Sequence, residues 1–125
     1  MKSMASLREP LSLSREVRLR LGHQYSAVRT NGISAHGPFF RLNCLKQEKE
    51  ITQLGIIVSK RVGAAVIRNK IKRRFREIYR NARPHLLPHF WLVIIAAPKA
   101  ATASFQELEK EWLRLGKKLS IFTAP

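Results

Sequence analysis

The sequence predicts a single α+β domain whose elements follow the order helix, strands, helix, strand, helix. Two segments carry apolar residues at helical spacing, one strongly basic and one near the C-terminus, whereas other segments show strand alternation or short continuous apolar runs. No internal repeat or shift of composition divides the chain. With 125 residues and 45% hydrophobic content, it is long enough to bury one core without disulfide bonds.

Three segments are predicted to be strands. Residues 40–44 alternate apolar and polar side chains, as a strand with one buried face does, and the polar stretch 46–50 makes the following turn. Residues 54–59 form a more deeply buried strand. The apolar run 90–97 is too short to cross a bilayer, so we expect it to be a central strand.

Two helices are predicted on either side of these strands. The first spans residues 22–31, where Tyr25 and Val28 are three residues apart, and it stops at the turn-forming pair Asn31-Gly32. The last begins at a capping box formed by Ser104 and Glu107. Its apolar stripe predicts packing on the core: Phe105, Leu108, Trp112, Leu115 and Leu119.

The middle helix is the most informative segment, because nine Lys and Arg residues fall between Lys60 and Arg80 against the single acid Glu77. Its apolar residues form one stripe that we expect to pack on the core: Ile67, Ile71, Phe75, Ile78 and Ala82. On another face, cations recur at steps of four: Arg68, Lys72, Arg76 and Arg80. Like charges at this spacing repel one another, so the pattern favours a helix held by its apolar stripe and neutralised by a polyanion.

The whole chain shares this bias, with 24 Lys and Arg against 8 acidic residues and a formal net charge of +16. A polyanionic partner is therefore expected. A merely solubilising surface usually mixes both signs with a smaller excess, and an interfacial membrane helix needs a wide apolar face with Trp. Nucleic acid is the favoured partner, with those two interpretations as alternatives.

The chain ends suggest a boundary at each side of the domain. Residues 1–20 are rich in Ser and Arg, and we expect residues 1–14 to form a flexible basic arm that settles on RNA, with an organelle transit peptide as the alternative. Residues 15–121 are then the domain and 122–125 a C-terminal tail. Because Cys44 is the only cysteine, no internal disulfide can form, and we expect a reducing, cytoplasmic location.

Catalytic groups are hard to find in this sequence. It contains no Asp, and its eight Glu show no cluster of the kind that holds Mg²⁺ for phosphodiester cleavage. His85 and His89 are flanked by Pro84 and Pro88, so we expect loop residues and neither an acid–base pair nor, with Cys44, a zinc site. We expect no catalytic residue in the protein; a free-standing nuclease is the opposing hypothesis.

With these elements placed, residues 19–119 resemble the protein subunit of bacterial ribonuclease P. The specific match runs from Leu54 to Arg76: a strand end GIIVS, then KRVG, AV, RNK and KR, and finally Arg76. Similarity outside this run is weaker and includes Gly32 and the segment VIIAAP. The run departs from the usual family pattern at Ala64 and at Lys70, where Arg is common, so bidentate phosphate geometry is lost at position 70.

The resemblance implies a fold: a two-layer α/β sandwich with a mixed four-stranded sheet and three helices in the order α-β-β-β-α-β-α, of the ribosomal protein S5 domain 2-like type. It also implies a left-handed β-α-β crossover, contrary to the usual rule.

The resemblance further implies the function of a protein subunit that binds a catalytic RNA and the 5′ leader of precursor tRNA. The RNA subunit would cleave the leader with Mg²⁺ that it binds itself, and neither a membrane nor an obligate protein partner is implied. Residues implied to contact the catalytic RNA are Lys60, Arg61, Arg68, Asn69, Lys70, Lys72, Arg73 and Arg76. For Arg74 and Arg80, contact with RNA and simple exposure to solvent are equally expected.

Four residues are implied to line the leader groove: Tyr25, Arg29, Phe40 and Asn43. Arg29 and Asn43 stand where some members carry aromatic residues, so we expect less base stacking and more pairing with phosphate. The alternative is a ribosomal or RNA-assembly protein with no part in cleavage.

Overall fold

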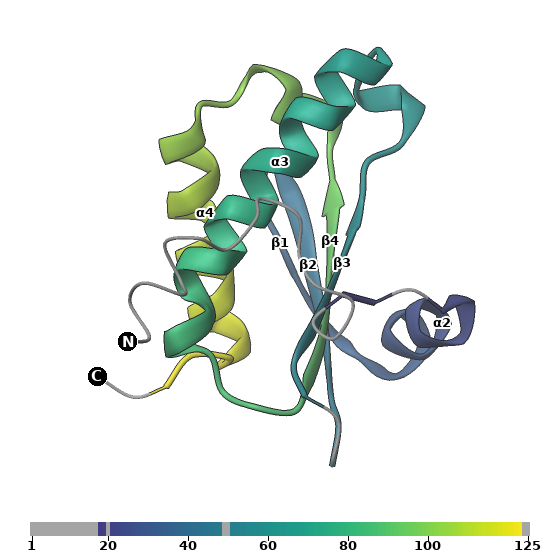
Figure 1. Ribbon diagram of the computed structural model, residues 1–125, viewed down its shortest axis with the longest axis vertical. Coiled ribbons are helices and arrows are strands. Elements are labelled where there is room, and N and C mark those ends of the chain that lie inside the picture. Colours follow the sequence, from purple (N-terminus) through teal and green to yellow (C-terminus); the bar gives the residue numbers. More distant parts are fainter. Residues whose placement is uncertain (1–17, 20, 49–50, 124–125) are drawn as a thin grey trace, which may run out of the picture.

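The computed structural model describes residues 18–19, 21–48 and 51–123, and the predicted order of elements is confirmed (Figure 1). The predicted arm 1–14 lies outside the described residues. The helices are α2 (Gly22–Asn31), α3 (Ala65–Ala82) and α4 (Phe105–Leu119), with short 3₁₀ helices η2 (Lys60–Val62), η3 (Arg83–His85) and η4 (Pro98–Thr102). The strands are β1 (Ile33–His36), β2 (Phe40–Lys46), β3 (Gln53–Ile57) and β4 (Phe90–Ala96).

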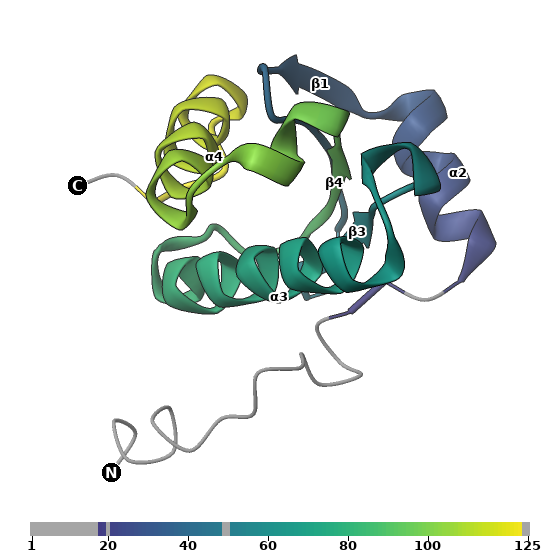
Figure 2. The same ribbon diagram turned by 90° about the horizontal axis from the view of Figure 1, so that it is seen from above.

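The four strands form one mixed sheet in the order β1-β2-β4-β3. Strand β2 pairs antiparallel with both β1 and β4, whereas β3 and β4 are parallel and joined through α3. The central position predicted for the apolar run of β4 is thus confirmed. Seen from the side of α3 with the strands pointing up, β4 lies to the left of β3, so the crossover is left-handed (Figures 1 and 2).

Helices α3 and α4 cover one face of the sheet, and α2 lies on the other (Figure 2). The main core fills the first face, where residues of β2 and β4 meet α3 and α4. A smaller apolar cluster on the second face contains Leu19, Val28 and Val93. The sheet therefore separates a thick hydrophobic layer from a thinner one that α2 covers only in part.

The apolar stripe of α3 is buried largely as predicted. Ile71, Phe75 and Ile78 are buried, and Tyr79 joins them. The prediction for Ile67 is wrong, because its side chain is 38% exposed. The first turn of α3 lies over the turn at Gly63, where Ile67 would be 3.3 Å from an added Cβ, and not over the sheet.

The C-terminal segment belongs to the fold. The capping box of α4 is confirmed, since Ser104 N donates to Glu107 Oε1 at 2.8 Å and Glu107 N donates to Ser104 Oγ at 3.1 Å. Phe122 packs edge-to-face on Trp112 with ring centroids 5.9 Å apart, and Thr123 N donates to His85 O at 2.7 Å. The predicted tail at 122–125 is therefore wrong for these two residues, because both are fixed against η3 and α4.

No helix in the described part of the chain is long and apolar enough to span a membrane.

Candidate nucleic-acid interface

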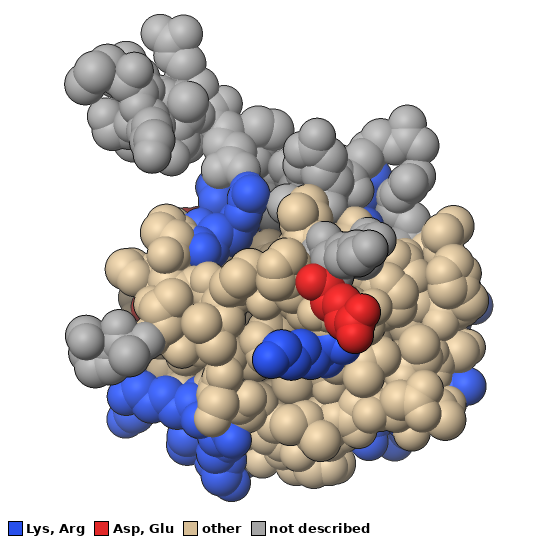
Figure 3. Space-filling model, turned by 90° about the horizontal axis from the view of Figure 1, so that it is seen from below, with Lys and Arg blue, Asp and Glu red and all other residues tan. Residues whose placement is uncertain are grey.

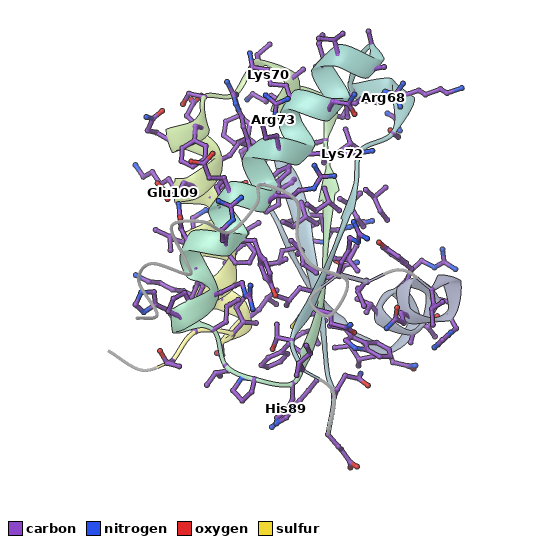
Figure 4. All side chains as sticks on the ribbon, viewed as in Figure 1. Arg68, Lys70, Lys72, Arg73, His89 and Glu109 are labelled. Atoms are coloured by element: carbon purple, nitrogen blue, oxygen red, sulfur yellow. The ribbon has the colours of Figure 1, made fainter. Side chains whose placement is uncertain are left out.

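The basic surface of this protein is the outward half of α3 together with η2. All eight residues predicted to contact a catalytic RNA lie on it and are exposed or half-buried: Lys60, Arg61, Arg68, Asn69, Lys70, Lys72, Arg73 and Arg76. Figure 4 shows Arg68 and Lys72 on the flank of α3 toward β3, and Lys70 and Arg73 on the other side. The structure thus brings this predicted set together as one surface.

The turn before α3 helps to fix the position of one cationic side chain of that surface, Arg68. Gly63 joins η2 to α3. Its φ of 155° is a backbone conformation that residues other than glycine rarely adopt. Arg68 Nε donates to the Gly63 carbonyl at 3.1 Å, which holds the guanidinium beside the turn and leaves its terminal nitrogens to reach a ligand.

Arg74 has a different task, although it lies within the same basic run. Its Nη1 donates to Ala103 O at 2.7 Å, immediately before the first residue of the α4 capping box. This bond ties α3 to the start of α4, so Arg74 supports the fold. Spacing alone shows no difference between Arg74 and its neighbours, because the partner is 29 residues away in the sequence.

A groove of about 190 Å³ lies on the other face of the sheet, between α2 and the strands. It contains three of the four residues predicted to hold a leader: Tyr25, Arg29 and Asn43. The remaining lining residues are Val28, Arg41, Ile57, Val93 and Ile95. The groove thus combines an apolar floor with two guanidinium groups at its sides.

The prediction that Phe40 lines this groove is wrong. Its side chain is 1% exposed and packs edge-to-face on Phe75, with ring centroids 5.0 Å apart, in the core beneath α3. Side chains alternate along β2, so its neighbour Arg41 points to the groove side with Asn43. Arg41 was missed, although its spacing of two from Asn43 was the available signal.

Asn43 carries the least satisfied polar group of the groove. It is 5% exposed, and its Oδ1 is buried without a hydrogen-bond partner among the described residues. A buried amide oxygen in this state is costly, and a donor brought by a ligand, with a small rotation of the amide, would relieve that cost.

Tyr25 lies where the groove meets the edge of the sheet. Its hydroxyl donates to Leu19 O at 3.2 Å, and its ring covers Gly55, where an added Cβ would come within 2.6 Å of the ring. Burial raises the pKa of the Tyr25 hydroxyl, and the nearby Arg18 partly opposes that rise. The match from Leu54 to Arg76 includes Gly55 but does not predict this contact, although a glycine inside an apolar strand signals such a close approach.

A notch of about 110 Å³ connects this end of the groove with the basic surface. Tyr25 and Gly55 line it from the groove side, Lys72 and Arg76 line it from α3, and Arg18 also lines it. None of the residues that line the notch is acidic. Cations therefore continue from α3 around the edge strand β3 to the groove.

The groups that a protein nuclease would need lie elsewhere. Figure 4 shows Glu109 on α4 and His89 at the end of the molecule far from Arg68 and Lys72. Cys44 is buried, which raises the pKa of its thiol to about 11. Among the described residues, no group of three or more His, Cys, Asp or Glu side chains is placed to hold a metal ion.

The charge is also unevenly spread over the surface. The end of the molecule that carries the β2–β3 turn shows mainly uncharged atoms, with an acidic patch beside a cation in the middle of the face and further cations near its margin (Figure 3). The fold and this concentration of charge define a small α+β protein whose cationic helix and adjoining groove form one continuous surface.

Comparison with known proteins gives the family. The family model described as Ribonuclease P matches residues 13–120. The ribonuclease P protein component of Roseiflexus castenholzii is 36% identical over 110 residues, which cover 87% of this chain and 90% of the relative. That of Desulfosudis oleivorans is 38% identical over 109 residues, with 87% and 90% covered. The chain therefore belongs to the ribonuclease P protein family, and as a member it is a protein component of ribonuclease P, an endoribonuclease.

Solved structures agree with this assignment. The ribonuclease P protein of Staphylococcus aureus superposes with a TM-score of 0.79 at 26% identity, covering 86% of this chain and 98% of that chain. The protein from Thermotoga maritima gives a TM-score of 0.70 at 29% identity, covering 78% and 92%. The α+β order and mixed sheet are thus those of the family.

Proposed function

We propose that this chain binds the catalytic RNA of ribonuclease P through the basic surface of α3 and η2. Seven of the eight predicted contact residues are cationic, and Glu77 is the single acid in α3. Each phosphate that such a surface neutralises releases condensed counterions, so binding is expected to weaken steeply with salt. Asn69 adds an amide that can donate to phosphate or accept from a ribose 2′-hydroxyl.

The groove between α2 and the sheet is proposed to hold the 5′ leader of precursor tRNA. A leader is single-stranded, so its bases can lie on the apolar floor at Ile57 and Ile95 while Arg29 and Arg41 pair with its phosphates. Tyr25 is the one aromatic residue lining this groove, so stacking is limited to one end.

The observation that carries this proposal is the notch shared by Tyr25, Lys72 and Arg76. It makes the groove and the basic surface neighbours without an intervening acid, so one protein can touch a leader and a catalytic RNA at once. By supplying positive charge there, the protein lowers phosphate repulsion and favours Mg²⁺ binding by the RNA, which performs the hydrolysis.

The test compares the affinity of the assembled complex for precursor tRNA with its affinity for mature tRNA. We expect the protein to strengthen binding of the precursor selectively, and Arg29→Ala with Arg41→Ala to remove that selectivity. Lys118→Ala, which removes an exposed cation in the last turn of α4, serves as the control. Equal affinities for both tRNAs would favour an RNA-assembly role instead.

A further inference from the structure

The first turn of α3 exposes apolar side chains in the middle of the basic surface. Val66 is 80% exposed, the largest exposed fraction among the large hydrophobic residues of the described chain, and its neighbour Ile67 is 38% exposed. Ala64 and Ala65, which precede them, are also exposed. The basic surface thus contains an apolar patch, Ala64 to Ile67, that stays exposed among the residues that the structure describes.

The start of α3 also lacks the groups that normally stabilise a helix end. Its N-cap is Ala64, which makes no side-chain hydrogen bond, and no acid occurs in its first turn. Helix α4 of the same chain has both, with Ser104 as N-cap and Glu107 in the first turn. An acid at the start of α3 would repel phosphate, so its absence fits a surface that meets a polyanion.

Cations surround this patch along the chain. Lys60 and Arg61 precede it in η2, and Arg68 and Lys70 follow it in α3. A protein partner with an apolar face would have to match this charge with acids, whereas RNA presents phosphates beside the uncharged faces of its riboses and bases. The arrangement of apolar centre and cationic rim is therefore complementary to RNA.

We propose that Val66 and Ile67 pack against a ribose or an unstacked base of the catalytic RNA while the surrounding cations hold its phosphates. This inference rests on the proposed function and adds a second kind of contact to it. Phosphate contacts weaken as salt rises, but burial of apolar surface does not. The interface then has a component of affinity that salt does not remove.

The test measures the dissociation constant of the full chain for ribonuclease P RNA over a series of salt concentrations. For Val66→Ser we expect binding about three- to tenfold weaker at every salt concentration, with an unchanged slope of affinity against salt. Val66→Ile should bind as tightly as the parent, because it keeps the apolar contact. Leu113→Ser, at a 47% exposed position on α4, is the matched control and should bind as the parent does.

Two results would overturn the inference: unchanged affinity of Val66→Ser, or a loss of affinity that comes with a flatter slope. Val66→Ser should not lose affinity through misfolding, because so exposed a side chain contributes little to the core. Thermal unfolding of the variant checks this directly. Failure of the proposed function is distinguishable, since Arg68→Ala would then also leave affinity and slope unchanged.

Discussion

The ring of Tyr25 lies directly over Gly55, so that a Cβ at Gly55 would stand 2.6 Å from Cε1 of the tyrosine. The contact joins α2 to the edge strand β3 at the point where the groove opens into the notch lined by Lys72 and Arg76. Tyr25 is the only aromatic residue that lines the groove, and the position of its ring therefore depends on the absence of a side chain at Gly55 in β3.

Replacing Gly55 by Ala tests this dependence. The added methyl should displace the Tyr25 ring, and because stacking on a base is worth about 1 to 3 kcal/mol, selectivity for precursor tRNA should fall by about 5- to 150-fold. Affinity for the catalytic RNA should stay near that of the parent. Gly22→Ala is the matched control, because an added Cβ there meets nothing within 4 Å. Unaltered selectivity in Gly55→Ala would show that the ring does not contact the leader.

Arg68→Ala should weaken binding to the catalytic RNA by about 1 to 3 kcal/mol and flatten the salt dependence by about one phosphate contact. Its guanidinium is held beside Gly63, so a contact there is preorganised. Filter binding or fluorescence titration at several salt concentrations measures both quantities.

Arg74→Ala is the control for that experiment. It should lower the free energy of unfolding by about 1 to 2 kcal/mol through loss of the bond to Ala103 O, with the salt slope of RNA binding unchanged. If both variants behave alike, the division of the basic run into contact and support residues is wrong.

Phe40→Ala should lower the free energy of unfolding by about 3 to 5 kcal/mol, because it leaves a cavity next to Phe75 in the main core. Urea denaturation followed by circular dichroism measures the loss. Phe40→Leu, which refills most of that space, should cost considerably less. A stable Phe40→Ala variant that had lost only precursor selectivity would return this residue to the groove.

Alkaline pH should destabilise the fold through two buried groups. Burial raises the pKa of the Cys44 thiol from 9.0 to about 11, and it raises the pKa of Tyr79 from 10.0 to about 12 against the opposing effect of Arg83. Both groups hold their protons more tightly in the folded state. Their contribution to stability is therefore complete below pH 9 and is lost as the pH rises toward 12.

Urea unfolding at a series of pH values from 9 upward checks this sign. In Cys44→Ala the part of the decline that begins near pH 9 should disappear, leaving the later part due to Tyr79. Stability that rises across this range would contradict the assignment of buried, protonated groups.

Much of the fold follows from local patterns in the sequence. The helical spacing in α3, the capping box of α4 and the apolar run of β4 each predict their element, because each pattern lies within one segment. Strand β1 has only four residues and a single buried one, Ala35, so it carries no alternation to detect. The local sequence predicts a tail at Phe122, because its partner Trp112 lies in another element.

Most residues of the site could be predicted from the sequence, but the direction in which their side chains point could not. Alternation along β2 places Phe40 and Arg41 on opposite faces of the strand, but it does not say which face meets α3 and which meets α2. That choice depends on how the sheet packs, which involves residues distant in the sequence. For the same reason the separate tasks of Arg68 and Arg74, and the contact of Tyr25 with Gly55, appear only in the folded chain.

The most direct test of a cationic partner to an RNA active site is cleavage of precursor tRNA at limiting Mg²⁺ by protein alone, ribonuclease P RNA alone, and both together. We expect no cleavage by RNA-free protein, slow cleavage by the RNA, and fast cleavage by the two, with Glu109→Ala and His89→Ala as active as the parent at saturating protein. Cleavage by protein rigorously freed of RNA, or equal rates with and without protein, would contradict a role as cationic partner.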